Sequence, residues 1–218
     1  MKNIYILGAG VQAKETYQIY SDNGLARNVA GFIVTLPGFR GGVLRGKKVY
    51  TSKVFREVPG GSLFIAAVGN SFKRRELVKS VGINSFNYDT LVHKSARVGD
   101  RVEIGEGTTI CAESILTCDI KIGKHVLINI GCLISHDVEL GDYVSLASGV
   151  NLAGRVGIGD GSWIGIGSSV IEDVTIGKNC FLGAGSIVVE DIPDNSLAYG
   201  VPARVIKKID KTDWEKLI

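Results

Sequence analysis

A strict six-residue repeat constrains the fold of this chain more than any other feature of its sequence. The repeat starts at Val98 and runs without insertion or deletion to Pro193, through sixteen hexads. The first position of every hexad is Ile, Leu or Val, eight second positions are Gly, and every fifth position is Val, Ile, Thr, Ser or Cys. An amphipathic helix repeats its apolar residues every three or four positions, and a strand every second position. A period of six therefore excludes both as continuous elements.

Such a chain must turn a corner once in each hexad. Short β segments joined at corners give a triangular coil of about 18 residues, in which the first positions fill the interior and the small fifth positions fit the tapering corner. Sixteen hexads make roughly five coils, each rising by one strand spacing of about 4.8 Å. We therefore predict an all-β parallel β-helix over residues 91–193, followed by a C-terminal capping segment with a short helix over residues 194–218.

The first ninety residues have a different pattern, which is typical of an α/β domain. A short apolar run is followed by the glycine turn Gly8-Ala9-Gly10 and then by a helix-forming stretch. This β-turn-α-β start predicts half of a Rossmann fold over residues 1–90. The predicted elements are strands at 4–7, 29–34 and 63–68, and helices ending at about residue 22 and spanning about residues 72–80.

The glycine turn suggests a phosphate ligand. Gly8-x-Gly10-x-x-Ala13 fits the dinucleotide fingerprint, in which glycines let backbone amides at a helix N-terminus approach phosphate. A nicotinamide-binding domain would carry an acidic residue after the second strand, where this chain has Val34 and Thr35. We therefore expect a smaller phosphate ligand than NAD, such as a nucleotide-linked sugar. Glycines that only make a tight turn between strand and helix are the alternative.

Charge and composition exclude several classes of protein. The chain has 25 basic and 22 acidic residues, and the net charge of +3 provides no basic face for nucleic acid. No run of 18 apolar residues occurs, and the apolar start is too short for a signal peptide, so we expect a cytoplasmic protein without membrane insertion. The four cysteines form no C-x-x-C pair, so we expect reduced, mostly buried thiols and no zinc site.

Five segments together resemble one family. They are the glycine turn, Ala67-Val68-Gly69-Asn70, Leu91-Val92-His93-Lys94-Ser95-Ala96, Ile134-Ser135-His136-Asp137 and Gly200-Val201-Pro202-Ala203-Arg204. The chain is in these respects similar to the sugar O- and N-acyltransferases with a left-handed β-helix. That family includes sialic acid O-acetyltransferases and bacillosamine- and perosamine-type amino-sugar N-acetyltransferases. The resemblance implies a left-handed helix, a homotrimer, and acetyl-CoA as co-substrate without a metal.

The resemblance also implies roles for individual residues. The motif histidine of the family is the general base and the acidic residue after it orients the ring, which gives these roles to His136 and Asp137. Gly154 lies one coil beyond His136, where a missing side chain would leave room for the pantetheine arm. The expected acetyl-CoA contacts are Ser145, Gly154, Ile166, Ala184, Val201 and Lys207, and the expected substrate contacts are Gly8, Gly10, Gln12, Gly69, Asn70 and Asn129.

The sequence departs from the family pattern at three places. Gln12 stands where many relatives have a histidine, and Val34 and Thr35 stand where they have an aspartate. Both differences concern recognition of the nucleotide. Ser145 stands where relatives have a second histidine. The group that polarises the thioester carbonyl is therefore open, with Ser145 and the amide of Gly154 as candidates.

These features predict an acetyl-CoA-dependent acetyltransferase acting on the amino group of a nucleotide-linked sugar, in lipopolysaccharide or capsule biosynthesis. An amine is a better nucleophile than a hydroxyl, so it suits a site that lacks the second histidine. The alternatives are O-acetylation of sialic acid or another sugar, and a non-catalytic nucleotide-binding scaffold. A zinc enzyme on the same solenoid would need three converging histidines. His93 and His125 do not stack with His136, so we expect them to face solvent or to be structural.

Overall fold

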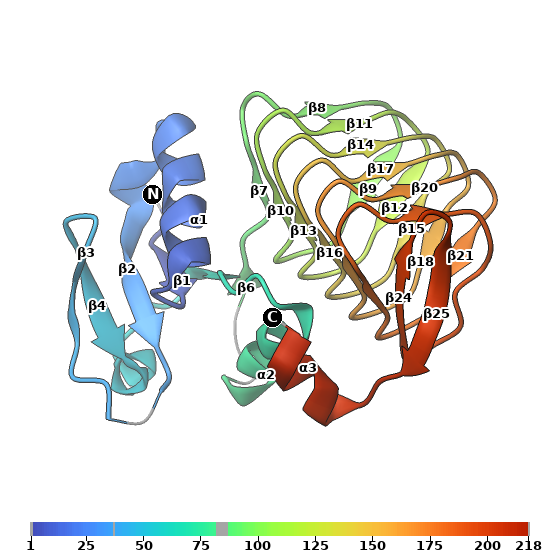
Figure 1. The fold of residues 1–218 in the computed structure, drawn as a ribbon. Helices are drawn as coiled ribbons and strands as arrows, with labels where there is room; N and C mark the ends of the chain where they lie inside the picture. Colours follow the sequence, from blue (N-terminus) through green and yellow to red (C-terminus); the bar gives the residue numbers. More distant parts are fainter. Residues whose placement is uncertain (1, 37, 82–86, 218) are drawn as a thin grey trace.

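The computed structural model describes residues 2–36, 38–81 and 87–217. An α/β domain at the N-terminus lies against one side of a solenoid of short parallel strands (Figure 1). A hairpin closes the far end of the solenoid, and a short helix follows it. The β-helix predicted from the hexads is confirmed.

The N-terminal domain is built on one six-stranded sheet with the order β3-β4-β2-β1-β5-β6. Neighbouring strands run parallel except β3 and β4, which form a hairpin. The strands are β1 (Ile4–Leu7), β2 (Val29–Val34), β3 (Gly42–Leu44), β4 (Lys47–Thr51), β5 (Leu63–Ala66) and β6 (Asn87–Tyr88). The helices are α1 (Val11–Asp22), α2 (Ser71–Ser80) and the short 3-10 helices η1 (Ala26–Asn28) and η2 (Ser52–Arg56).

The strands and helices that the sequence predicts in this domain occur within one or two residues of their expected positions. β1 is buried at every residue, as expected for a strand that is covered on both faces. The hairpin of β3 and β4 is absent from the sequence prediction. Of its strand residues only Val49 is buried, and β4 begins with two lysines, so the hairpin lacks the apolar alternation of a strand.

The β-helix has three faces, each a parallel sheet. The domain-side sheet faces the α/β domain and consists of β7 (Leu91–Val92), β10 (Thr109–Ile110), β13 (Leu127–Ile128), β16 (Ser145–Leu146), β19 (Trp163–Ile164), β22 (Phe181–Leu182), β24 (Ser196–Gly200) and the antiparallel β25 (Ala203–Lys208). The apolar sheet consists of β8 (Arg97–Val98), β11 (Ile115–Leu116), β14 (Leu133–Ile134), β17 (Asn151–Leu152), β20 (Ser169–Val170) and β23 (Ile187–Val188). The charged sheet consists of β9 (Val102–Ile104), β12 (Ile120–Ile122), β15 (Glu139–Leu140), β18 (Gly157–Ile158) and β21 (Thr175–Ile176).

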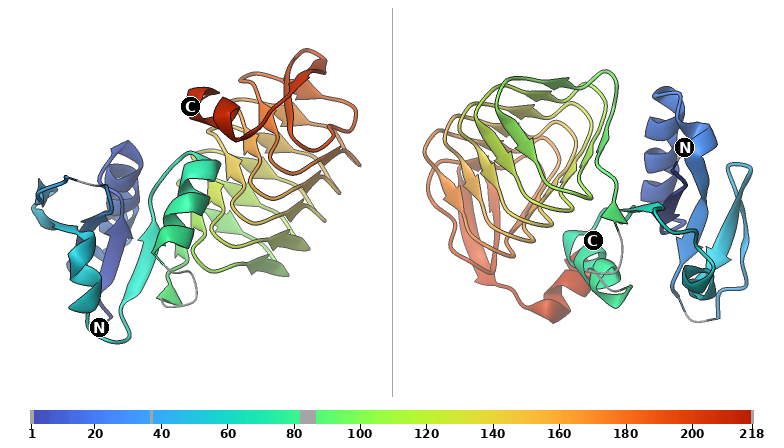
Figure 2. Two further views of the ribbon diagram at one scale, coloured as in Figure 1. Left: turned by 90° about the horizontal axis from the view of Figure 1, so that it is seen from below. Right: turned by 180° about the vertical axis from the view of Figure 1, so that it is seen from behind.

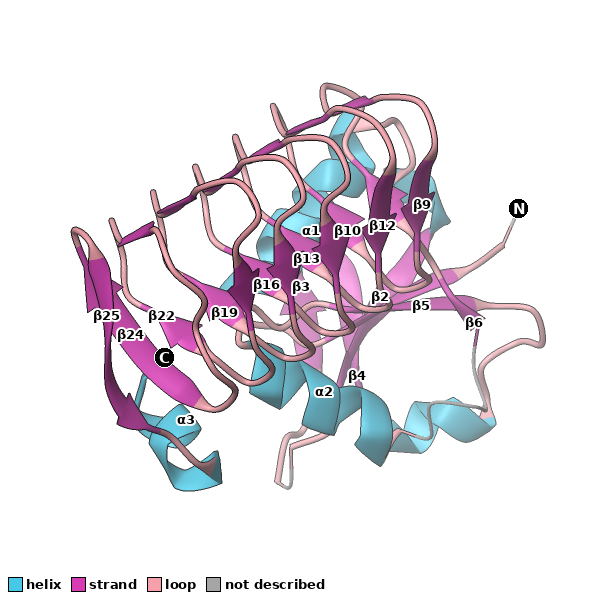
Figure 3. Cartoon of the chain, turned by 90° about the vertical axis from the view of Figure 1, so that its right-hand side faces the viewer, coloured by secondary structure: helices cyan, strands magenta, loops and turns pink. Residues whose placement is uncertain are grey.

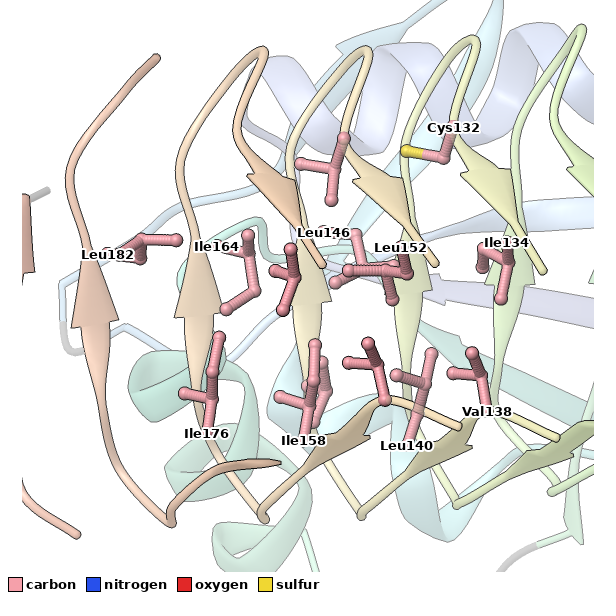
Figure 4. Packing of buried hydrophobic residues seen from close by; sticks show 14 of the residues in the cluster. Cys132, Ile134, Val138, Leu140, Leu146, Leu152, Ile158, Ile164, Ile176 and Leu182 are labelled. Carbon is pink, nitrogen blue, oxygen red and sulfur yellow. The ribbon is translucent and has the colours of Figure 1, made fainter. Parts of the chain in front are cut away.

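The hexad positions have distinct places in each coil. First positions point inward and stack into one apolar core along the solenoid (Figure 4). Every fourth position from Arg101 to Gly185 has a positive φ, so the corner is a left-handed backbone turn. Fifth positions follow this turn and are buried, as Val138 and Val144 are. Second positions are often Gly because coils approach closely there: a Cβ on Gly99 would lie 1.7 Å from the carbonyl oxygen of Thr117.

Three helices cover the domain-side sheet (Figures 2 and 3). Apolar residues of α1 share a core with Leu91, Cys111 and Leu127 of the first coils. The hydroxyl of Ser71 in α2 donates to the carbonyl of Gly161, at 2.8 Å. In α3 (Lys211–Leu217), Trp214 is buried with its ring edge-on to Phe181, at a centroid distance of 5.8 Å. The N-terminal domain therefore occupies one of the three faces.

Candidate active site

His136 and Asp137 lie at a corner of the β-helix, on the edge between the apolar sheet and the charged sheet. They follow β14 and precede β15, and Asp137 has the left-handed backbone of a fourth position, with φ of 59°. Nδ1 of His136 lies 2.8 Å from Oδ2 of Asp137. A carboxylate only accepts, so this bond places the imidazole proton on Nδ1 and leaves the lone pair on Nε2. About half of each side chain is exposed, so a substrate can reach Nε2.

Gly154 lies directly beside the ring of His136. A Cβ at position 154 would be 2.5 Å from Cε1 and 2.7 Å from Nε2 of His136. The space into which a side chain at position 154 would point is thus filled by the His136 ring, and a contact of Gly154 with acetyl-CoA stays a prediction. The glycine leaves room for the imidazole to pack against the next coil.

An open groove runs along the apolar sheet next to this edge. Ser135 and Ala153 are in its wall and immediately precede His136 and Gly154, so the groove runs up to the residue before His136. A ligand in the groove could therefore contact the ring. Its lining residues are Leu133, Ser135, Asn151, Leu152, Ala153, Ser169, Val170, Ile171 and Glu172.

The other expected acetyl-CoA contacts lie elsewhere in the chain. Ile166 and Ala184 are exposed on the edge between the domain-side and apolar sheets, and Val201 is exposed in the turn after β24. The apolar sheet separates this edge from the edge that carries His136. Nζ of Lys207 lies 2.5 Å from Oδ1 of Asp213, so its ammonium group already has an anionic partner.

A cavity of about 860 Å³ lies in the N-terminal domain at the carboxyl ends of β1, β2 and β5. Open α/β sheets bind their ligands at this position. The structure brings four expected substrate contacts together in its wall, namely Gly8, Gly10, Gln12 and Gly69. The other lining residues are Ala9, Val11, Ile33, Val34, Thr35, Leu36, Phe39, Ala67, Val68, Lys73, Glu76, Leu77 and Ser80.

Two buried side-chain amide nitrogens in the described part of the chain have no hydrogen-bond partner, one on Gln12 in the cavity wall and one on Asn70, which follows the wall residue Gly69 but does not itself line the cavity. Oδ1 of Asn70 accepts from the N–H of Lys73 at 2.8 Å and caps α2, but its Nδ2 is unpartnered in the described part of the chain. The same holds for Nε2 of Gln12. Burying a donor without an acceptor costs free energy, which an oxygen-rich ligand would recover. Asn129 is not in this wall; it lies at the end of β13, where its Oδ1 accepts from the N–H of Ile130.

Ser145 lies between the two domains. It is buried, its Oγ accepts from Nη2 of Arg74 at 2.9 Å, and its hydroxyl donates to the carbonyl of Gly69 at 3.0 Å. Its hydroxyl is therefore engaged at the domain interface and does not face the edge of His136. Sequence reasoning missed Arg74, which contacts six oxygen atoms from both domains.

The other two histidines are structural, and the expectation that they could face solvent is wrong. His125 is fully buried between Tyr88 and Tyr143, with ring centroids 4.5 Å and 5.1 Å apart. This burial lowers the pKa of His125 to about 4. His93 is also buried, with Nδ1 2.9 Å from Oγ of Ser95. Among residues 2–36, 38–81 and 87–217, no three His, Cys, Asp or Glu side chains form a group that could hold a metal.

Helices of this chain are short. Within the ranges that the structure describes, none is both long and apolar enough to cross a lipid bilayer.

Comparisons with known proteins agree with this geometry. Residues 119–154 and 155–189 match the family model described as bacterial transferase hexapeptide (six repeats). Over 121 residues the chain is 36% identical to UDP-N-acetylbacillosamine N-acetyltransferase of Bacillus subtilis (strain 168). That match covers 51% of this chain and 52% of the relative, so it spans about half the length of the curated relative.

Two solved structures match almost the whole chain. One is a variant of perosamine N-acetyltransferase from Caulobacter crescentus in complex with CoA and GDP-perosamine, with 30% identity and a TM-score of 0.86 over 95% of this chain and 98% of that one. The other is the acetyltransferase domain of PglB from Neisseria gonorrhoeae in complex with acetyl coenzyme A. It has 25% identity and a TM-score of 0.85, over 94% of this chain and 99% of that one. The chain therefore belongs to the hexapeptide-repeat family of sugar acyltransferases, together with the perosamine and bacillosamine N-acetyltransferases.

Proposed function

We propose that this protein transfers the acetyl group of acetyl-CoA to the amino group of a nucleotide-linked amino sugar. The observation that carries the proposal is the accessible His136–Asp137 pair beside a groove, on a solenoid attached to a domain with a cavity suited to phosphate. The relative from Bacillus subtilis is named as an amino-sugar N-acetyltransferase, and the structure from Caulobacter crescentus holds CoA and GDP-perosamine. Both support this reaction and this class of acceptor.

In the proposed reaction, His136 is the general base. The sugar amine attacks the thioester carbonyl carbon while Nε2 of His136 takes its proton, so a C–N bond forms and the C–S bond breaks. The proton then passes to the departing CoA thiolate, which leaves as the thiol. Asp137 holds the proton on Nδ1 and stabilises the imidazolium.

The N–H of Gly154 is the proposed donor to the oxyanion. It has no hydrogen-bond partner in the described part of the chain, and it lies next to the His136 ring. A donor aimed at the developing charge contributes to acyl transfer more than one aimed at the ground state. Of the two donors expected from the sequence, Gly154 is favoured because the hydroxyl of Ser145 is engaged with Arg74 and Gly69.

We propose a homotrimer in which the apolar sheet of each subunit faces its neighbours. The domain-side sheet is already covered, and the charged sheet carries ion pairs such as Lys121–Glu139, at 3.0 Å. The apolar sheet instead leaves Leu133, Ile171 and Ile187 at least 38% exposed. Three flat, short prisms can bury such faces around a threefold axis and form acetyl-CoA clefts between subunits.

The same geometry supports a shared active site. In a triangular solenoid the edge that carries His136 is opposite the domain-side sheet, so the cavity of one subunit cannot reach its own base. The cavity would instead meet His136 of the neighbouring subunit. Mixed trimers of His136→Ala and a cavity-filled Gln12→Trp variant should therefore regain activity that neither variant has alone. No recovery in co-purified mixed trimers would refute the shared site.

We further propose that the protein acts in the cytoplasm, in the biosynthesis of a surface glycan such as lipopolysaccharide or capsule. The cysteines are all free, as is usual in a reducing compartment.

To test the reaction, the protein is given acetyl-CoA and either amino sugars or sialic acid as acceptor, each free and nucleotide-linked with UDP, GDP, dTDP or CMP. Release of CoA is followed with a thiol reagent. Release of CoA that depends on a nucleotide-linked amine, with the new acetyl on nitrogen by NMR, is expected. Acetyl only on oxygen, or no release with any acceptor, would overturn the proposal.

A further inference from the structure

Arg74 is a fully buried cation without an anionic partner. It is 2% exposed, and no carboxylate among the described residues forms an ion pair with it. Its guanidinium is surrounded only by neutral oxygen atoms, at distances of 2.7 to 3.1 Å. The acceptors are the carbonyls of Val68, Gly69, His125, Tyr143 and Val144 and the hydroxyl of Ser145.

These acceptors come from two parts of the molecule. Val68 and Gly69 line the cavity of the N-terminal domain, whereas His125, Tyr143 and Ser145 belong to two successive coils of the solenoid. Nη1 lies 2.7 Å from the carbonyl oxygen of Val68 and 2.9 Å from that of Gly69. Arg74 therefore fixes the wall of the cavity to the solenoid through one rigid group.

The bonds of Arg74 also determine where two backbone N–H groups point. In a trans peptide the C=O and the N–H point in opposite directions. The carbonyls of Val68 and Gly69 accept from Arg74, so the N–H groups of Gly69 and Asn70 point away from it, and Gly69 is in the wall of the cavity. Neither N–H has a hydrogen-bond partner in the part of the chain that the structure describes. The unpartnered Nε2 of Gln12 belongs to the same wall, where Oε1 of Gln12 lies 3.4 Å from the point at which a Cβ on Gly69 would stand.

We infer that Arg74 is a positioning residue for a diphosphate group bound in this cavity, a role that rests on the proposed function. It turns the N–H groups of Gly69 and Asn70 toward the ligand, and it places an uncompensated positive charge one peptide unit behind them. Successive free N–H groups backed by a cation form a site for an anion.

The charge of Arg74 favours a ligand that brings its own negative charge. Burial lowers the pKa of Arg74 to about 9, which still leaves it protonated at neutral pH. A buried charge without a partner is unfavourable, and a nearby anion relieves this cost. A nucleoside diphosphate should therefore bind much more tightly than the same nucleoside without phosphate.

The test measures binding of the nucleoside and of its diphosphate, for the base that the wild type prefers among uridine, guanosine and thymidine, by titration calorimetry. Three variants are compared. Arg74→Lys keeps the positive charge but loses the planar guanidinium group, and Arg74→Met loses both. Ser145→Ala is milder, because it removes only one of the oxygen atoms that accept from Arg74. Arg75→Met is the matched control, because Arg75 also joins α2 to the solenoid, through Oδ1 of Asn179 at 3.1 Å, but contacts no cavity carbonyl. Binding of acetyl-CoA reports whether each variant still folds.

The preference for diphosphate over nucleoside should fall at least tenfold in Arg74→Met, and by a smaller factor in Arg74→Lys and Ser145→Ala. Affinity for the nucleoside alone should stay within threefold, and Arg75→Met should resemble the wild type. If nucleoside and diphosphate weaken equally, or neither changes, Arg74 only holds the domains together and the inference is overturned while the proposed function stands. If the wild type binds none of the diphosphates, both are overturned.

Discussion

The ring of His136 lies against the Cα of Gly154, 2.5 Å from the point where a Cβ would stand. The two residues are one coil apart, so the repeat itself brings them together. The side chain of His136, the proposed base, is thus held between Asp137 on one side and a bare backbone on the other.

Gly154→Ala should displace the imidazole without disturbing the solenoid. The φ of Gly154 is not in the left-handed region, so alanine fits the backbone, and its methyl group would overlap only with the ring of His136. We expect kcat to fall about 10²-fold, the scale of a mispositioned base, while KM for acetyl-CoA changes less than threefold. Gly157→Ala is the control, because its Cβ would meet Thr175 at an ordinary 3.6 Å. A large rise in KM with unchanged kcat would mean that position 154 faces acetyl-CoA instead.

Asp137→Asn tests the proton on Nδ1. Asparagine tolerates the positive φ of position 137, so the corner should keep its shape. Its amide can donate to Nδ1 and stabilise the tautomer that has its proton on Nε2, which cannot act as a base. Steady-state kinetics should show kcat reduced by about 10²- to 10⁴-fold with little change in melting temperature. Asp137→Asn activity equal to wild type would show that Asp137 does not orient the ring.

His125 should make the folded protein sensitive to acid. Burial and then the charge of Arg74 lower its pKa to about 4, against about 6.5 in the unfolded chain. Between these values only the unfolded state binds the proton, so the free energy of unfolding should fall as pH drops from 6.5 toward 4. The nearby charged groups are Arg74, Glu106, Lys124 and Asp142.

The pH effect of His125 is measurable by urea unfolding at several pH values from 4.5 to 7.5. The His125 contribution should amount to roughly 3 kcal/mol over the window. His125→Asn, which suits the φ of 55°, should be less stable at neutral pH but should lose less stability on acidification. Parallel stability curves for the wild type and His125→Asn would contradict the assignment.

Charge on the apolar sheet should break the proposed trimer. Leu133→Asp with Ile187→Asp places two carboxylates on a face that would be buried, and a buried unpaired charge is strongly unfavourable. Light scattering should give three times the single-chain mass of 23.2 kDa for the wild type and lower masses for the variant. Thr175→Asp on the exposed charged sheet is the control and should remain trimeric. A wild type with the mass of one chain would refute the trimer.

The repeat made the solenoid and the outward position of His136 at a corner predictable. Once Ile134 is known to point inward, the corner two residues later must carry His136 outward, and Gly154 must lie one coil away. Spacing alone did not show that the imidazole of His136 fills the space where a side chain at position 154 would point.

Contacts between the two domains could not be read from local pattern. Arg74 and Arg75 are adjacent in an ordinary polar helix, yet only Arg74 is buried and bonded to both domains. Ser145 and His125 occupy hexad positions that point outward, and they are buried only because α2 and Tyr88 cover them. Such burial depends on how the domain docks, which no periodicity along the chain encodes.

The most direct test of the central claim is the turnover of His136→Ala with acetyl-CoA and the best nucleotide-linked amino sugar. Because a positioned base contributes roughly 10² to 10⁴ in rate, kcat should fall by that factor while the melting temperature and acetyl-CoA affinity stay at wild-type values. Activity of the folded variant within about threefold of wild type would show that His136 is not the base, and would contradict the account.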